Sequence, residues 1–189
     1  MLAVVLTRIT LGRGEEVKRV TEEMSIPWDV SNYQPLPVWR PSPANEVKSP
    51  EYDLYAVNYK LPFHTFSRTI DNTWLKELTE YHPSAYYILI NTQAAKRKGL
   101  EDGDLVWIQE ATGGEKVKGR VKVTEGVHPE VVGIAGCFGH WAKGLPVAEG
   151  KGLHFNSLFP TDLDVLWERV DTVGHAMDFS FKVKVFKAR

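Results

Sequence analysis

The sequence predicts a mainly β domain with short helices, in which the strands close into a barrel. One observation is that the segments after residue 51 are mostly short runs rich in β-branched and aromatic residues, which is typical of strands. The other is that turn signals containing glycine and aspartate separate these runs at short, regular spacing. This spacing favours a closed barrel over a doubly wound sheet.

The first half of this region is predicted to alternate strands with short helices. Residues 52–59 form the first predicted strand. Residues 73–81 form a helix with Asn72 as a candidate N-cap, because an asparagine side chain can accept the unpaired N–H groups of a first turn. A buried strand at residues 86–90 leads into a second short helix over residues 91–100, which stops at a glycine. Three apolar residues share one face of the first helix: Trp74, Leu75 and Leu78.

The second half is predicted to consist of hairpins and a glycine-rich segment. A tight turn at residues 101–104 assigns Asp102 and Asp104 to turn formation rather than to a functional site. Residues 112–115 form a hairpin turn, and six glycines follow between residues 133 and 152. The remaining strands are predicted at residues 105–110, 117–124, 131–134 and 179–186.

Residues 1–50 differ in composition from the rest of the chain, because they contain six of the eleven prolines. Proline fixes φ and lacks a backbone donor, so the stretch 35–43 can be neither a helix nor a central strand. We expect an extended arm here, which either packs on this chain's own barrel or embraces a partner. A short charged helix is predicted at residues 15–24. The predicted domains are therefore a helix and proline-rich docking arm over 1–50 and a barrel over 51–189.

Composition excludes several classes of protein. The 189 residues carry 23 Lys and Arg against 24 Asp and Glu, a net charge of −1, which argues against a broadly basic nucleic-acid binder. Cys137 is the single cysteine, so the chain can form neither an intrachain disulfide nor a multi-cysteine metal site. We expect Cys137 to be a small buried residue and the compartment to be cytoplasmic, the alternative being export as the passenger of a partner. The apolar run at residues 2–6 is too short for a signal peptide or a membrane span.

The chain also lacks the recognised signatures of self-contained catalysis. No Ser/His/Asp spacing of a known kind, no zinc-protease motif and no phosphate-loop motif is present. We therefore predict no catalytic residue and no metal ligand within these 189 residues.

An ordered set of motifs carries a resemblance to a known family. Its most specific part joins Ile90-Asn91-Thr92-Gln93-Ala94-Ala95 to Gly99-Leu100-Glu101-Asp102-Gly103-Asp104-Leu105-Val106. Further segments follow in the same order, at residues 119–123, 128–132, 139–141, 152–156 and 183–185. Together they resemble the C-terminal domain of the dimethyl sulfoxide reductase family, over residues 52–188. The resemblance implies a double-psi β-barrel that covers a cofactor, here two molybdopterin guanine dinucleotides carrying molybdenum or tungsten.

The resemblance implies a cofactor contact at the loop after the first strand. In this chain the loop begins Asn58-Tyr59-Lys60, where the family more commonly has a Gly-Arg pair, so the prediction rests on the loop more than on any one side chain. Hydroxyls, cations and backbone N–H groups in one irregular loop suit a pyrophosphate or a pterin. The candidate cofactor-binding residues of this loop are Lys60, Leu61, His64, Thr65, Phe66 and Ser67. For His64 the alternative is a histidine satisfied by neighbouring backbone.

Two later segments supply the remaining candidates. Gly139, His140 and Trp141 follow a buried strand, where glycine permits close approach of a ligand; the alternative is a turn with Trp141 in the core. Asn156 offers both a donor and an acceptor to the edge of a heterocycle, or alternatively serves in a turn or cap. The last candidates, by resemblance, are Asp178 and Phe179.

These implications predict a cofactor-binding domain or small subunit of a molybdenum or tungsten oxidoreductase that is inactive alone. A larger catalytic subunit, or missing domains, would share the cofactor and hold the metal ligand and any iron–sulfur cluster. The start at Met1 suggests a separately encoded subunit or a truncated product. No nucleic-acid partner and no direct membrane insertion are expected. The rival interpretations are a non-redox double-psi barrel used for interaction or nucleotide recognition, and a remnant without function.

Overall fold

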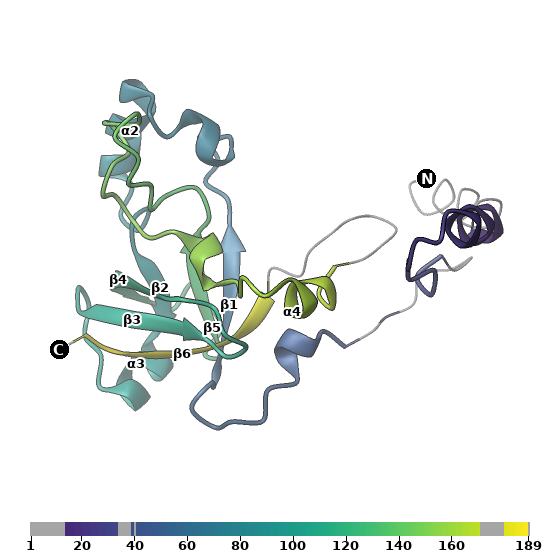
Figure 1. Cartoon of the computed structure of the whole chain (residues 1–189). Helices are drawn as coiled ribbons and strands as arrows, with labels where there is room; N and C mark the ends of the chain where they lie inside the picture. The colour runs from purple at the N-terminus through teal and green to yellow at the C-terminus, as the bar shows by residue number, and fades with distance from the viewer. Residues whose placement is uncertain (1–13, 34–38, 40, 171–179, 189) are drawn as a thin grey trace. The chain divides into compact units, whose positions relative to one another are not determined.

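The computed structural model describes residues 14–33, 39, 41–170 and 180–188 (Figure 1). The predicted candidates Asp178 and Phe179, and most of the proline-rich stretch, lie outside the described residues. The chain divides into two compact units, and the larger one comprises residues 43–168 together with the final strand. In the smaller unit, residues 14–23 are helical, as the sequence predicts. The boundary between predicted domains stays a prediction.

The larger unit is a closed barrel of six strands in the order β1-β5-β2-β4-β3-β6. Its topology is that of a double-psi β-barrel, which confirms the predicted fold class. The strands are β1 (Leu54–Tyr59), β2 (Ile88–Asn91), β3 (Leu105–Glu110), β4 (Lys116–Thr124), β5 (Val131–Ala135) and β6 (Ser180–Lys187).

Two of the six pairings in the barrel are parallel. Strand β1 pairs with β5 in parallel, with Asn58 opposite Ile134, and β2 pairs with β4 in parallel. Because the carboxyl ends of parallel neighbours meet at one edge, the chain leaves β1 and β5 at the same mouth of the barrel. Strand β2 runs antiparallel to β5, so it ends at the opposite mouth. Figure 1 shows α2, which follows β1, at one end of the barrel and α3, which follows β2, at the other.

The barrel interior is filled by every second residue of each strand. In β3, Val106, Ile108 and Glu110 are buried and their neighbours are partly exposed, as the period of two requires. The largest fully buried apolar side chains come from the strands and one 3-10 helix, among them Ile88, Ile90, Ile134, Phe155 and Phe181. Removing such surface from water contributes most of the stability of a barrel of this size.

The predicted helix caps are confirmed. Helix α2 (Thr73–Tyr81) begins after Asn72, whose Oδ1 accepts the N–H groups of Trp74 and Leu75 at 3.0 and 3.2 Å. Helix α3 (Thr92–Lys98) begins after Asn91 and ends at Gly99, which adopts a left-handed φ of 62°. Glycine adopts this φ without steric cost because it has no Cβ.

The turn at residues 101–104 is structural, as predicted. Asp102 accepts the Val123 N–H at 2.8 Å, and Asp104 accepts the Glu101 N–H at 2.9 Å. Each carboxylate also pairs with a lysine, and these hydrogen bonds lower the pKa of both carboxyls.

Four short elements were not predicted from the sequence, and two strand starts were placed too early. The missed elements are η1 (Pro43–Asn45), η2 (Phe66–Thr69), η3 (Phe155–Leu158) and α4 (Leu163–Trp167). Strands β1 and β2 begin two residues later than predicted because Tyr52 and Tyr87 donate their N–H groups to turns, at Ser49 and Ser84. Among the described residues, no helix is both long and apolar enough to cross a membrane.

Candidate functional site

The mouth at the carboxyl ends of β1 and β5 is built from two loops, which we call loop 60–72 and loop 136–156. They adjoin directly, since the Gly136 N–H donates to the Tyr59 carbonyl at 3.2 Å. The ring of Phe138 meets the ring of His64 edge-on at 5.5 Å between centroids. All candidate residues that the sequence predicts and the structure describes lie on these two loops.

A small apolar cluster supports the loops from below. It contains Leu61 and Ile70 from the first loop and Ala135, Cys137 and Phe138 from β5 and the second loop. Burial raises the pKa of the Cys137 thiol to about 11 and that of the Tyr59 hydroxyl to about 12. Cys137 is therefore a buried thiol that stays protonated near neutral pH, as expected from the sequence.

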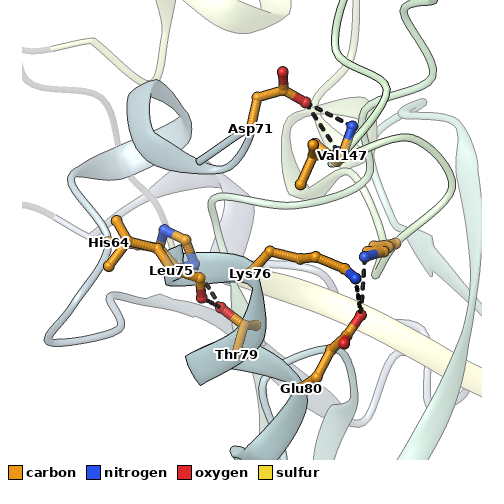
Figure 2. A network of polar contacts seen from close by, with 9 residues as sticks. His64, Asp71, Leu75, Lys76, Thr79, Glu80 and Val147 are labelled. Carbon is orange, nitrogen blue, oxygen red and sulfur yellow. Dashed lines mark hydrogen bonds and ion pairs between the residues drawn. The ribbon is translucent and has the colours of Figure 1, made fainter. Parts of the chain in front are cut away.

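His64 ties loop 60–72 to helix α2 through both of its ring nitrogens. Its Nε2 lies 2.7 Å from Thr79 Oγ1 (Figure 2). Its Nδ1 lies 3.0 Å from Thr69 Oγ1. Thr79 Oγ1 donates its one hydrogen to the Leu75 carbonyl at 2.6 Å, so it can only accept from His64. Nε2 must then carry the proton, and Nδ1 accepts from Thr69.

This assignment gives His64 a neutral ring with every polar atom satisfied. Burial lowers the pKa of His64, which favours the same neutral form. Thr69 Oγ1 also accepts the Thr65 N–H at 3.0 Å, so the chain of hydrogen bonds fixes the loop backbone as well. Two threonine hydroxyls satisfy the ring, whereas the alternative interpretation of His64 named neighbouring backbone as its partner. A cofactor contact of His64 stays a prediction.

Two carboxylates join helix α2 and its lead-in to loop 136–156. Asp71 accepts the backbone N–H groups of Val147 and Ala148 at 2.7 and 3.2 Å. Glu80 pairs with Lys76 on its own helix at 3.1 Å and with Lys151 on the other loop at 3.0 Å (Figure 2). The two lysines lower the pKa of the Glu80 carboxyl. The two loops of the mouth are thus held in one arrangement by polar contacts.

The candidates on loop 60–72 separate into two groups. Leu61 and His64 are buried in this chain, so their side chains shape the loop from inside. The exposed candidates are Lys60, Thr65, Phe66 and Ser67.

Phe66 is the unusual residue of the exposed group. Its backbone φ is +50°, a left-handed value that side chains with a Cβ rarely adopt. Its ring is 59% exposed, and Lys60 Nζ lies 4.2 Å from the ring centroid. A strained backbone therefore presents a flat apolar surface together with a cation.

Loop 136–156 folds back on itself around two glycines. The Gly139 N–H donates to the Lys151 carbonyl at 2.8 Å, and the Gly150 N–H donates to the His140 carbonyl at 3.0 Å. Gly139 has a φ of +84°, and a Cβ there would lie 2.0 Å from the His154 nitrogen. Only glycine allows this approach of two backbone segments.

The approach brings together three rings. His154 lies edge-on to His140 and to Trp141, with centroids 5.8 and 5.3 Å apart, and its Nδ1 lies 2.9 Å from Ser157 Oγ. Burial, and to a lesser extent His140, lowers the pKa of His154. Trp141 is 68% exposed, so the alternative of core packing for Trp141 is wrong.

Two residues of the mouth, His154 and Asn58, were not predicted from the sequence. His154 stands two residues before the candidate Asn156 and within the same motif, which was the available signal. Asn58 continues the inward series of Leu54 and Ala56 to the end of β1, and its buried Oδ1 has no hydrogen-bond partner in the described structure. A Cβ on Gly136 would lie 2.1 Å from its Nδ2, so a glycine makes room for this amide.

Asn156 is an exposed residue of η3, on the segment that closes loop 136–156. The mouth therefore offers a cation, two exposed aromatic faces, hydroxyls and amides within one framework. Such a set suits a ligand that combines a flat heterocycle with an anionic group. The orphaned Asn58 acceptor calls for an N–H donor, which pterin and guanine rings both carry.

Comparison with protein families agrees with this chemistry. Residues 54–166 match the family described as the Molydopterin dinucleotide binding domain, which is well over half of the chain. The chain belongs to this family of domains, whose cofactor is a molybdopterin dinucleotide. This confirms the resemblance found in the sequence.

Two curated relatives are molybdopterin-containing chains of reductases. The chain is 32% identical over 110 residues to PhsA, the molybdopterin-containing subunit of the thiosulfate reductase of Salmonella typhimurium, covering 58% of the chain and 14% of the relative. It is 28% identical over 135 residues to ArrA, the molybdopterin-containing subunit of the arsenate respiratory reductase of Chrysiogenes arsenatis, covering 65% of the chain and 16% of the relative. The chain thus spans only about one seventh of the length of these relatives.

A solved structure shows the same fold. Acetylene hydratase from Pelobacter acetylenicus superposes on 89% of this chain with a TM-score of 0.60, at 17% identity and over 22% of its own length. The described fold therefore occurs as one part of a much larger molecule.

Proposed function

We propose that this chain covers a molybdopterin guanine dinucleotide inside a molybdenum oxidoreductase, with the mouth at β1 and β5 as the contact surface. The observation that carries the proposal is that loop 60–72 and loop 136–156 meet at one mouth and are fixed there by His64, Asp71 and Glu80. A pre-formed framework of this kind lowers the ordering cost of binding.

Four exposed residues of the mouth and the partly buried Asn58 have roles in the proposal. Lys60 pairs with a phosphate or pyrophosphate oxygen, while Phe66 and Trp141 pack against the planar rings. Asn156 and Asn58 hydrogen-bond to the edge of a heterocycle through their amides. The molybdenum cofactor supplies the redox chemistry when bound, and these residues bind and orient it.

The partner in this proposal is a larger catalytic chain that holds the metal ligand. Support comes from the relatives, of which this chain covers only 14% and 16%. Further support comes from helix α2, where Trp74, Leu78 and Tyr81 lie on one face at 78%, 54% and 81% exposure. Large exposed apolar patches mark interfaces, and a neighbouring domain would cover this one.

The test is co-purification of the chain with its catalytic partner from a host that makes the dinucleotide. Molybdenum and the fluorescent oxidised pterin are then measured per complex. The variant Lys60→Gln with Phe66→Ala and Asn156→Ala should lower pterin retention about tenfold or more, because it removes several contacts at once. Lys96→Gln with Val57→Ala and Gln93→Ala, at exposed positions of α3 and β1 outside the two loops, is the control and should retain the wild-type content.

A complex that assembles but holds neither pterin nor molybdenum would contradict the proposal. Stoichiometric binding of a free nucleotide by the chain alone, with no partner captured, would instead favour the nucleotide-recognition module.

A further inference from the structure

The outward face of β4, β3 and β6 concentrates positive charge on the barrel wall, away from the mouth. Along β4 the outward positions are successive cations, and the central strand β3 places Trp107 and Gln109 beside them. The pairing registers put Trp107 between Lys118 and Phe186, and Gln109 between Lys116 and Lys184. We call this surface the cationic face; its basic residues are Lys116, Lys118, Arg120, Lys122, Lys182 and Lys184.

The cations of this face are supported mainly by aromatic rings. Lys116 and Lys118 lie 5.2 and 5.3 Å from the Trp107 ring centroid, and Lys182 lies 4.2 Å from that of Tyr55. Two of the six have an ion pair within the described part of the chain, Lys184 with Glu51 at 2.9 Å and Lys122 with Asp102 at 2.8 Å. Contacts of this kind hold a side chain in place without neutralising its charge.

No acidic residue occupies an outward position of these three strands: β4 alternates Lys116, Lys118, Arg120 and Lys122, and β6 alternates Ser180, Lys182, Lys184 and Phe186. Like charges on adjacent positions of a sheet repel one another and destabilise the fold. The whole chain carries a net charge of −1, so this clustering is not a consequence of overall composition.

We propose that the cationic face docks an acidic surface of another protein. Charge complementarity is the argument, because the other four cations form no ion pair with the described residues and so favour a negatively charged partner. An acidic protein surface fits better than a single-stranded nucleic acid for two reasons. The Trp107 ring that would stack on a base already carries two lysines. In addition, Glu51, Asp102 and Asp104 form ion pairs at the border of the face and would repel a long phosphate backbone.

The experiment uses the full chain and poly-L-glutamate as a defined acidic probe, with binding measured by fluorescence anisotropy against salt. The triple variant Lys116→Gln, Lys118→Gln and Lys182→Gln should weaken binding about tenfold or more at low salt. The wild-type affinity should also fall steeply as salt rises. The matched control is Lys18→Gln, Lys48→Gln and Lys96→Gln, which removes the same charge from other exposed positions and should weaken binding about twofold or less.

Two outcomes of this experiment would contradict the proposal. Equal loss in the two triple variants would show that only net charge matters. Tighter binding of oligothymidylate than of poly-L-glutamate through the same lysines would show a nucleic-acid surface instead. Thermal unfolding of both variants verifies that they are folded.

Discussion

The barrel interior and the mouth of this domain are stabilised in different ways. The interior is mostly apolar, with Glu110 as a buried exception, and its side chains follow from strand alternation, as with Val106 and Ile108 in β3. The mouth is held by hydrogen bonds and ion pairs between segments distant in sequence, such as Asp71 with Val147. It also keeps exposed aromatics and a strained residue, Phe66.

This difference shows that the interior serves stability and the mouth serves binding. Loss of side-chain volume in the close-packed interior lowers the free energy of unfolding, and the interior atoms are not accessible to a ligand. The mouth contains exposed aromatic side chains and a strained backbone, neither of which stabilises the fold. Backbone strain of this kind concentrates at binding sites. The two regions should therefore respond differently to substitution.

The largest effect is expected in the interior. Phe181 is fully buried and packs against Phe155 and Phe159 at 5.4 and 5.0 Å between centroids. Phe181→Ala should lower the free energy of unfolding by about 3–5 kcal/mol, measured by urea denaturation. Phe186→Ala, on the outward side of the same strand, is the control and should cost less than about 1 kcal/mol. Similar losses in both would contradict the division between inside and outside.

The next effect is expected at the glycine that closes the mouth. Gly139→Ala places a Cβ against the His154 backbone at a φ of +84°, so stability should fall by about 2–3 kcal/mol. Hydrogen exchange should rise first in loop 136–156. Gly144→Ala, where a Cβ meets nothing within 4 Å, should be neutral. An unchanged Gly139→Ala protein would show that the loop is not packed as described.

A smaller effect is expected at the polar tie below the mouth. Thr79→Val keeps the shape of the side chain but leaves the His64 Nε2–H without an acceptor, which should cost about 1–3 kcal/mol. Thr73→Val, at an exposed position of the same helix, should cost within about 0.5 kcal/mol. If both variants lose the same stability, His64 is not held by Thr79.

The smallest effect is a dependence on pH. Burial lowers the pKa of His64 and of His154 below the ordinary value of 6.5. The unfolded chain then binds more protons than the folded one as pH falls below 6.5, so stability is full above that pH and declines below it. Urea denaturation between pH 5 and pH 8 should show this decline, with a shallower slope in His64→Gln. A wild-type stability that rises as pH falls would contradict the neutral assignment.

The barrel strands, the N-cap of the first helix, the glycine end of the second and the family could be predicted from the sequence, because these rest on local alternation, capping chemistry and ordered motifs. Asn72 and Gly99 act as predicted, since each needs only its own neighbours along the chain. The loops of the mouth were also found, by resemblance.

Only the tertiary structure decided which residues of those loops face outward. Leu61 and His64 share a short segment with Phe66, yet the first two are buried and the third is exposed. The difference depends on Thr79 of helix α2 and on Phe138 of the other loop. Asn58 and His154 were missed for the same reason, because their surroundings come from parallel pairing and from a glycine that lets two backbones meet. Contacts between distant segments have no local signature, and they set the chemistry of this mouth.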